Sequence, residues 1–524
     1  MEQLSALDAA FVYLESPRSP MHVGGVYLVD RARASPDFGH ETVRAHIAGR
    51  LQLARTFRQR LVEVPLALGH PFWVEDPDFD LLHHLPCRTL EPPGGKRELM
   101  ALAAEVFEQP LDRARPLWEL IFVDGLDSYP GMTPGSMALI GRVHHAAVDG
   151  MSGVEIMGAL LDPAPDTARP LPPDPWKPER LPGGLELAAR SYRKLGAKSI
   201  DLARGLRETV RGAGDLLSEV GGGSGPGSSV RPTLPLQAPR SPLNRPVSGE
   251  QSFGGVDFDL DRIKGVRSRV PGATVNDVVL ALCSGALRRW LKDRDELPEK
   301  PLVAMVPVSV RTRDEQGTQS TKTLGNQVSA MLVDLATELA GPHLRLAAIQ
   351  RATRGAKGSG MILPANRLME FVPSETAAMA ARLYTRLKVA ERHRPFFNLV
   401  ITNVPGPQIP IYLAGAEVHG HIGMAPIFDG MGLILVVFSL SGRLSIGITA
   451  CADILPNVGE FESMLEDSLA ELEGPSGTGP EDPGDLEEQL ARRGRRPEIE
   501  ALHGASRRLG EAIERLNRSL DEEE

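Results

Sequence analysis

The sequence of 524 residues contains only three cysteines, Cys87, Cys283 and Cys451, and they lie far apart. There is no CxxC pair and no even-numbered framework, which excludes a disulfide-stapled secreted scaffold and a structural zinc module. The first residues lack the basic region and apolar core of a signal peptide. These absences indicate a protein of the reducing cytoplasm.

Long hydrophobic runs and excess positive charge are also missing. The longest apolar stretch, 431–440, is about half of the roughly 20 residues that a membrane-spanning helix needs. The formal net charge is −10 and the pI is about 5.8, which argues against a partner of duplex nucleic acid. With 42% hydrophobic and 24% charged residues, the chain is expected to fold.

Three familiar catalytic signatures are absent as well. The sequence has no GxxxxGK[ST] phosphate loop, no GxSxG nucleophile elbow and no GxGxxG after a strand. Neither a nucleotide cofactor nor a covalent serine intermediate is therefore expected.

Composition divides the chain into two α/β lobes, a linker and a tail. Residues 1–161 and 249–473 are of mixed α/β character, and residues 162–248 are rich in proline and glycine. Residues 474–524 form a charged tail that is expected to be helical. Strands are expected at 23–29, 79–85, 117–123, 137–143, 302–310, 327–335, 399–403, 433–440 and 444–450. Helices are expected at 41–53 and 274–290, the latter with a cap at 274–277.

The linker contains a basic stretch with apolar residues at near-helical intervals between 190 and 217. Such a helix can rest on an anionic membrane surface, or it can pack across two domains with its basic face merely solvated. Both readings stay open.

The most informative segment, 137–153, reads MALIGRVHHAAVDGMSG. A strand leads into His144 and His145, and because neighbouring side chains on a strand point to opposite faces, both cannot line one cavity. One of them is expected to work and the other to pack or hydrogen-bond. Asp149 follows the strand end, where it can orient a ring or brace the turn, and Gly150 permits a positive φ or a close backbone approach.

A histidine with a pKa near neutrality can remove a proton from a hydroxyl as that oxygen attacks a carbonyl. Two half-buried structural histidines beside a turn are the alternative. The HHxxxD spacing also offers metal-ligand types, but it lacks the helical HExxH arrangement, so no metal is expected. A second pair, His83 and His84, lacks the following Asp-Gly and is interpreted as structural.

The segment HHAAVDG at 144–150 matches the HHxxxDG motif of CoA-dependent acyltransferases. Around it, the chain resembles the bacterial wax ester synthase/diacylglycerol acyltransferase family over roughly residues 4–470. The resemblance rests on an ordered set of segments: 4–29 (LSALDAAFVYLESPRSPMHVGGVYLV), 115–120 (RPLWEL), 274–282 (TVNDVVLAL), 324–335 (LGNQVSAMLVDL), 398–407 (NLVITNVPGP) and 442–456 (GRLSIGITACADILP).

The resemblance implies a fold of two chloramphenicol-acetyltransferase-like lobes with mixed sheets, and a tunnel between them. It implies transfer of a fatty acyl group from acyl-CoA, as a substrate and not a cofactor, to diacylglycerol or a long-chain alcohol. By the same resemblance His145 is the general base, attack is direct without an acyl-enzyme, His144 supports, and Asp149 shapes the loop with Arg115 as a candidate partner.

Oxyanion support or substrate binding is expected from the second lobe. Asn276 is the leading candidate, with helix capping by the Asn276–Asp277 pair as its alternative. Thr402 and Asn403 are candidates for the tunnel wall, with a turn before Pro405 as theirs. Gly150, in the first lobe, is the fourth candidate for this role.

A hydrophobic acceptor implies peripheral contact with a membrane or lipid-droplet surface. Two other functions remain open. The first is a condensation-type enzyme that takes its acyl group from a carrier, although about 50 residues after the second lobe are too few for a carrier domain. The second is a non-catalytic lipid-binding scaffold.

Overall fold

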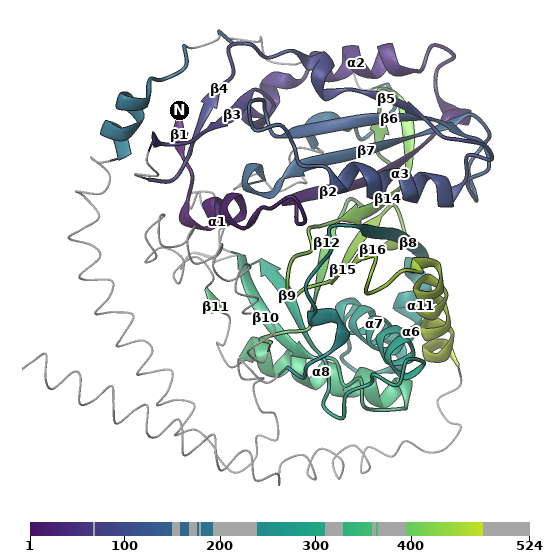
Figure 1. The fold of residues 1–524 in the computed structure, drawn as a ribbon. Coiled ribbons are helices and arrows are strands. Elements are labelled where there is room, and N and C mark those ends of the chain that lie inside the picture. The colour runs from purple at the N-terminus through teal and green to yellow at the C-terminus, as the bar shows by residue number, and fades with distance from the viewer. Residues whose placement is uncertain are drawn as a thin grey trace, which may run out of the picture.

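The computed structural model describes residues 1–65, 69–148, 158–166, 176–177, 180–191, 238–309, 328–358, 363–364 and 395–474. Asp149, Gly150, most of the basic linker stretch and the tail from residue 475 lie outside the described residues. Two large mixed sheets with helices dominate the fold (Figure 1). This confirms the expected α/β class and the organisation in two lobes.

The first large sheet has six strands in the order β13-β14-β2-β7-β6-β5. Their bounds are β2 (His22–Asp30), β5 (Cys87–Thr89), β6 (Trp118–Leu126), β7 (Ser136–His144), β13 (Tyr412–Leu413) and β14 (Ala416–Met424). Helix α2 (His40–Ala48) packs on one face through Val43 and Ile47, and α3 (Lys96–Glu108) packs on the other through Leu99 and Ala103. Strands β2 and β7 therefore lie in the middle of a sheet that is covered on both faces.

The second large sheet has seven strands in the order β11-β10-β9-β12-β15-β16-β8. Their bounds are β8 (Gln251–Asp259), β9 (Val303–Ser309), β10 (Val328–Asp334), β11 (Leu363–Pro364), β12 (Leu399–Pro405), β15 (Leu433–Leu440) and β16 (Arg443–Cys451). The helices around it are α6 (Leu260–Arg269), α7 (Val275–Lys292), α8 (Pro342–Gly358) and α11 (Val458–Glu473). Helix α7 contacts the other three and is buried almost all round, so it forms the centre of this core.

A small third sheet flanks the first. It has the order β1-β4-β3 and consists of β1 (Glu2–Gln3), β3 (Gln59–Val62) and β4 (Phe72–Glu75). Helix α1 (Ala6–Leu14) follows β1, starts at the cap Ser5 and lies against the turn that follows β7. This contact brings the beginning of the chain to the HHxxxDG segment.

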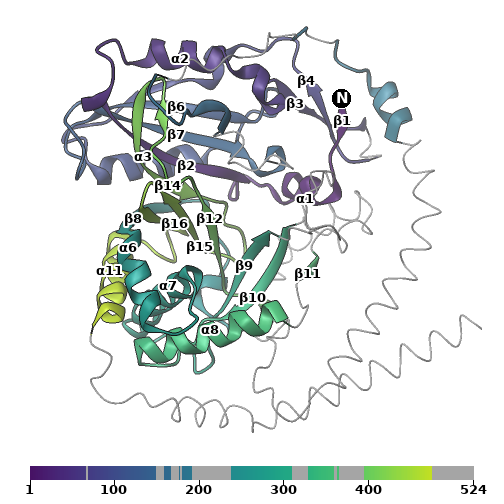
Figure 2. The same cartoon turned by 180° about the vertical axis from the view of Figure 1, so that it is seen from behind.

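Strand β14 joins the two lobes. It comes from the second half of the chain, yet it pairs antiparallel with β2, and in both views it lies between β2 and the second sheet (Figures 1 and 2). It crosses β16 at Gly423 and Gly447, whose backbones are in direct contact. The approach is so close that a Cβ on Gly447 would collide with the Gly423 carbonyl. Two glycines are thus required for the sheets to approach this closely.

Most of the expected elements are present. The strands expected at 23–29, 117–123, 137–143, 302–310, 327–335, 399–403, 433–440 and 444–450 are confirmed with small shifts at their ends. The helix at 274–290 is confirmed, and its cap is Thr274, whose hydroxyl accepts the Asp277 N–H while the Asp277 carboxylate accepts the Thr274 N–H. Ser441 and Gly442 both have positive φ, as a tight hairpin requires.

One expected strand is wrong. Residues 79–85 contain a 3₁₀ turn, η5 (Leu81–His84), and the Asp80 side chain caps it by accepting the Leu82 N–H. The ring of His84 stacks between Phe79 and Trp118. The apolar run is therefore explained by packing around a turn and not by strand pairing.

We expect Gly447→Ala to lower the free energy of unfolding by about 1–3 kcal/mol, because the added methyl group collides with backbone that cannot rotate away. Gly265→Ala in α6 is the control, since a Cβ there meets nothing within 4 Å and should raise stability by about 0.5–1 kcal/mol. Urea unfolding of both variants measures the difference. Equal stability of the two would contradict the proposed close crossing.

Candidate active site

The two histidines of the HHxxxDG segment lie at the junction of β7 with a 3₁₀ turn, η6 (His145–Ala147). His144 ends the strand with an extended backbone (φ −63°, ψ 136°). Side-chain alternation therefore continues to the next residue, and the two rings leave the strand on opposite sides. The His145 N–H donates to the carbonyl of Met21 over 2.7 Å, which anchors the turn to the start of β2.

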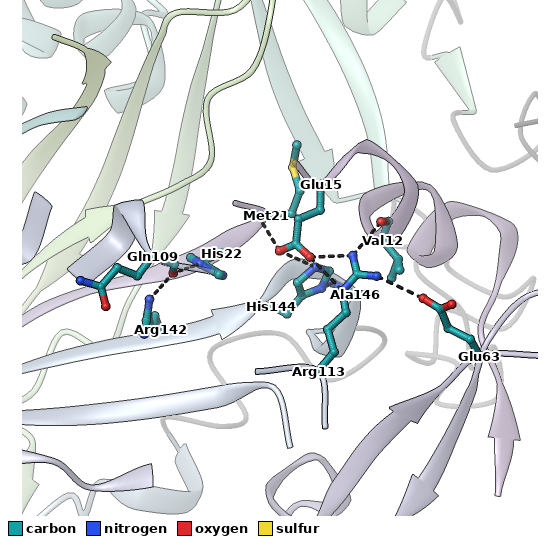
Figure 3. A network of polar contacts seen from close by, with 10 residues as sticks. All are labelled: Val12, Glu15, Met21, His22, Glu63, Gln109, Arg113, Arg142, His144 and Ala146. Carbon is teal, nitrogen blue, oxygen red and sulfur yellow. Dashed lines mark hydrogen bonds and ion pairs between the residues drawn. The ribbon is translucent and has the colours of Figure 1, made fainter. Parts of the chain in front are cut away.

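The side chain of His144 is buried, with 1% of its surface exposed. Its Nδ1 accepts the backbone N–H of Ala146 over 3.1 Å, so the neutral ring carries its proton on Nε2. That Nε2 lies 3.5 Å from Oε1 of Glu15 (Figure 3). Nδ1 of His144 is thus held by a backbone N–H, and Nε2 is buried beside the Glu15 carboxylate without a hydrogen bond among the described residues.

Glu15, directly after α1, is the centre of a polar network (Figure 3). Its Oε2 accepts from Nε and Nη2 of Arg113 over 3.0 and 2.6 Å, and its Oε1 accepts the Met21 N–H over 3.4 Å. Burial raises the pKa of this carboxyl, but His144 and Arg113 together outweigh burial and lower the pKa to about 2. Glu15 is therefore ionised and holds His144 and Arg113 in place.

His145 has a different environment. Its ring stacks on Phe11 of α1 with centroids 3.7 Å apart and planes 14° apart, and part of its surface remains exposed. Burial lowers its pKa to about 4; its own carbonyl raises the pKa and His144 lowers it further. Nδ1 is buried and has no hydrogen-bond partner among the described residues. Near neutral pH this ring is uncharged and can accept a proton.

A third histidine, His22, lies opposite His144 in the β2–β7 register. Its Nε2 lies 2.9 Å from the carbonyl oxygen of Gln109, and its pKa is lowered to about 4 by burial first and by the charge of Arg142 second. Arg142 in turn donates to Glu119 and to the same Gln109 carbonyl. His22 therefore adds no positive charge next to His144.

The second lobe brings two of the candidate residues together. Asn276 lies in the first turn of α7, and the side-chain amide of Asn403 on β12 donates to its Oδ1 over 3.2 Å. The carboxylate of Asp277 instead completes the helix cap and accepts from Thr353. The capping role thus belongs to Thr274 and Asp277, and the Asn276 side chain pairs with β12.

Thr402 and Asn403 point to opposite faces of β12. In the parallel pairing with β15, Thr402 lies beside Val436 and Asn403 beside Val437. Val436 packs where a Cβ on Gly423 of β14 would be, so Thr402 shares the face turned toward the first sheet. Asn403 shares the face turned toward α7. Among the described residues, neither side chain forms a hydrogen bond with the two motif histidines.

Two further sequence predictions concern nearby residues. His84 is 3% exposed and its Nδ1 lies 2.8 Å from the carbonyl oxygen of Trp118, which agrees with a packing role for this ring, whereas His83 is exposed. Nε of Arg115 lies 3.3 Å from Asp112. Its predicted partner Asp149 lies outside the described residues, as does Gly150.

Phe11, Glu15 and Arg113 were missed by the sequence reasoning. Phe11 and Glu15 lie within the segment 4–29 that carries part of the resemblance, which was the available signal. Sequence spacing could not show that the beginning of the chain reaches the end of β7. In the part of the chain that the structure describes, no cluster of three metal-ligating side chains and no helix long and apolar enough to cross a membrane are found.

We expect Glu15→Gln to lower the free energy of unfolding at pH 7 by about 2–3 kcal/mol, because it leaves Arg113 and His144 without the charge they face. The folded pKa of Glu15 is below its usual 4.5, so its contribution is complete above about pH 4.5 and is lost as the pH falls toward 2. Denaturant unfolding from pH 2 to 7 should show the difference between the two proteins shrink as the pH falls below about 4.5. Glu63→Gln removes the exposed partner of the same Arg113 and should cost about 0.5 kcal/mol or less.

The chain is similar in sequence to known acyltransferases. The model of the wax ester synthase/diacylglycerol acyltransferase catalytic domain matches residues 4–279, and the model of the family's C-terminal domain matches residues 324–473. Two putative diacylglycerol O-acyltransferases of Mycobacterium tuberculosis are 32% and 36% identical over 478 and 474 residues. The alignments cover 90% of this chain in both cases, and 90% and 99% of the relatives.

Solved structures agree. A wax ester synthase/diacylglycerol acyltransferase of Marinobacter aquaeolei VT8 is 29% identical, with a TM-score of 0.62, and the match covers 90% of this chain and 98% of that one. A trichothecene 15-O-acetyltransferase of Fusarium sporotrichioides, 12% identical with a TM-score of 0.53, shares the fold. The matches confirm the resemblance inferred from the motifs: the chain belongs to the wax ester synthase/diacylglycerol acyltransferase family.

Proposed function

We propose that the protein transfers a fatty acyl group from acyl-CoA to the hydroxyl of diacylglycerol or of a long-chain alcohol, with His145 as the general base. The observation that carries this proposal is the contrast between the two motif histidines. His144 is buried, with Nδ1 bound to a backbone N–H and Nε2 facing Glu15, whereas His145 is uncharged, stacked on Phe11 and partly exposed. A base needs that second environment.

The reaction proceeds by direct attack. His145 accepts the proton of the acceptor hydroxyl as the oxygen attacks the thioester carbonyl, and a tetrahedral intermediate with a negatively charged oxygen forms. When the carbon–sulfur bond breaks, the imidazolium returns the proton to the departing sulfur, so that ester and CoA thiol leave and the ring is neutral again. No acyl-enzyme forms, which is consistent with the absence of a nucleophile elbow in the sequence.

Glu15 and His144 act as positioning residues in this proposal. Glu15 binds the backbone N–H of Met21, and the carbonyl of Met21 binds the backbone N–H of His145. One ionised carboxylate thus holds both the residue before β2 and the ring next to the base. A base must be placed accurately, since small displacements of a catalytic group are expensive in rate.

Stabilisation of the oxyanion is assigned to the second lobe. Asn276 is the first candidate because its amide is oriented by Asn403 and lies in the first turn of α7, where the helix dipole favours negative charge. Thr402 is the candidate on the face turned toward the first sheet. Asp149 and Gly150 are proposed to shape the loop after the base.

A lipid acceptor implies a peripheral position at a membrane or lipid-droplet surface. Transfer from a carrier-bound acyl group is the second candidate reaction, because the same fold and motif suit it. A scaffold that binds lipid without turnover is the third. Both alternatives predict that the purified protein forms no ester from acyl-CoA alone, which the leading proposal requires.

The first test is ester formation from palmitoyl-CoA with either a diacylglycerol or hexadecanol, using the complete protein and His145→Ala. We expect the substitution to lower kcat/KM by about 10²–10⁴, the usual contribution of a general base. His83→Ala, in the exposed half of the other HH pair, should retain full activity.

Ester from the unmutated protein alone establishes the reaction, and the ratio of products gives the preferred acceptor. A well-folded protein that forms no ester with either acceptor would favour a carrier-dependent enzyme or a scaffold. Equal loss of thermal stability in His145→Ala would point to a structural histidine.

The pH dependence gives an independent prediction. The base must be neutral, and the pKa of His145 in the free protein is about 4 and not the usual 6.5. We therefore expect kcat/KM to stay level between pH 7.5 and about pH 5 and to fall only as the pH approaches 4. The profile is measured with buffers matched for ionic strength. A fall of kcat/KM centred near pH 6.5 would contradict the prediction, because the base would then titrate like an exposed histidine.

A further inference from the structure

The start of the basic linker stretch is attached to the small sheet. Residues 184–191 form a short helix that lies at the edge of the molecule, next to β1 and β4 (Figures 1 and 2). Leu187 is 2% exposed and packs in one cluster with Phe72 of β4. The hydroxyl of Ser191, also buried, accepts from the side-chain amide of Gln3 of β1 over 3.3 Å. One side of the helix is therefore fixed on the first lobe.

The other side of this helix is apolar although it faces solvent. At about 3.6 residues per turn, Leu185 and Ala189 lie on the side away from the buried Leu187. Ala189 is exposed, and Leu185 is 91% exposed, whereas no other large hydrophobic side chain among the described residues exceeds 55%. A surface helix normally turns polar residues to solvent, so an apolar outer side indicates a partner that covers it.

Positive charge borders the apolar side. The side chains of Arg180 and Arg190 lie 3.4 and 2.9 Å from the carboxylate of Glu186, and 79% and 44% of their surfaces remain exposed. One carboxylate thus faces two guanidinium groups, which leaves a net positive charge. The three side chains line a hollow of about 400 Å³ together with Met1 and Val74, so an anion can still reach the arginines.

The chain continues from this helix with more positive charge. Residues 192–211 (YRKLGAKSIDLARGLRETVR) contain six basic and two acidic residues, in a chain whose net charge is −10. They lie outside the described residues, but the helix determines where they begin. Basic side chains next to an exposed leucine match a surface that is anionic at its face and apolar beneath it, which is the interface of a membrane with acidic lipids.

We propose that the outer side of residues 184–191 docks on an anionic lipid surface. Leu185 enters the boundary between headgroups and acyl chains, and Arg180 and Arg190 bind the lipid phosphates, which guanidinium groups match in geometry. The inference rests on the function proposed above, since an acceptor dissolved in lipid has to be reached from that surface. Of the two interpretations of the basic stretch, it favours contact with a membrane over packing between domains.

The first measurement is flotation of the complete protein with vesicles of pure phosphatidylcholine or of an equal mixture with phosphatidylglycerol. We expect binding to the mixed vesicles that weakens with added salt. Leu185→Ser should raise the apparent Kd about tenfold, because an apolar side chain no longer enters the lipid. Arg180→Gln should raise it about fivefold, the usual effect of one basic residue near such a surface.

Two variants outside the helix serve as matched controls. Ile409→Ser removes another exposed apolar side chain, which is 52% exposed and lies between β12 and β13. Arg245→Gln breaks a second exposed ion pair, in which Arg245 lies 2.8 Å from Glu296. Both should leave the apparent Kd for the mixed vesicles unchanged, because neither residue belongs to the proposed docking side.

Activity separates docking from catalysis. With palmitoyl-CoA and a diacylglycerol in the mixed vesicles, Leu185→Ser should form ester more slowly, in proportion to its weaker binding. With palmitoyl-CoA and hexanol dissolved in buffer, it should match the unmutated protein. No ester from any acceptor would mean that the proposed function fails, while flotation would still report docking.

Equal vesicle binding by Leu185→Ser and Ile409→Ser, or no binding by the unmutated protein, would overturn the inference. So would a lower unfolding temperature of Leu185→Ser without vesicles, which would show that another segment of this chain covers the leucine. Loss of a dimer in ultracentrifugation, with unchanged vesicle binding, would assign this side to a second copy of the chain. If Leu185→Ser does not fold, the comparison of Arg180→Gln with Arg245→Gln decides the result.

Discussion

Strand β14 is supplied by the second half of the chain, yet it pairs with β2 from Glu417 to Met424 and completes the first sheet. Without this pairing β2 would be an edge strand, and the first lobe would still meet the second where α3 packs on β8 and where Lys96 pairs with Glu462 of α11. Backbone hydrogen bonds across the lobes fix their distance, and the close approach of Gly423 and Gly447 fixes the crossing. The position of Thr402 relative to the first sheet follows from these contacts.

The two motif histidines have different surroundings because their rings lie on opposite sides of β7. His144 faces an ionised carboxylate that is already paired with Arg113, and His145 faces an aromatic ring. The ring of His144 is held in place, and Nδ1 of His145 has no hydrogen-bond partner among the described residues. Two consecutive residues can have these different environments because the backbone at His144 is extended.

Local signals predicted much of this molecule. The alternating strands, the cap at Thr274, the hairpin at Ser441-Gly442 and the importance of the HHxxxDG segment depend on neighbours in sequence. Glu15 and β14 depend on contacts between distant segments, which spacing does not encode. The run at 79–85 was misassigned because an apolar segment that packs around a turn has the same composition as a strand.

The pairing of Met424 with Gly24 spans about 400 residues of chain, which has a consequence for biosynthesis. A ribosome that has released the whole first lobe has not yet made the strand that covers β2, so the nascent lobe carries an open strand edge in the middle of its future sheet. At about 5–20 residues per second, that edge waits for tens of seconds. The glycines of β2 lower the β-propensity of this edge and so reduce its tendency to pair with the wrong chain during the wait.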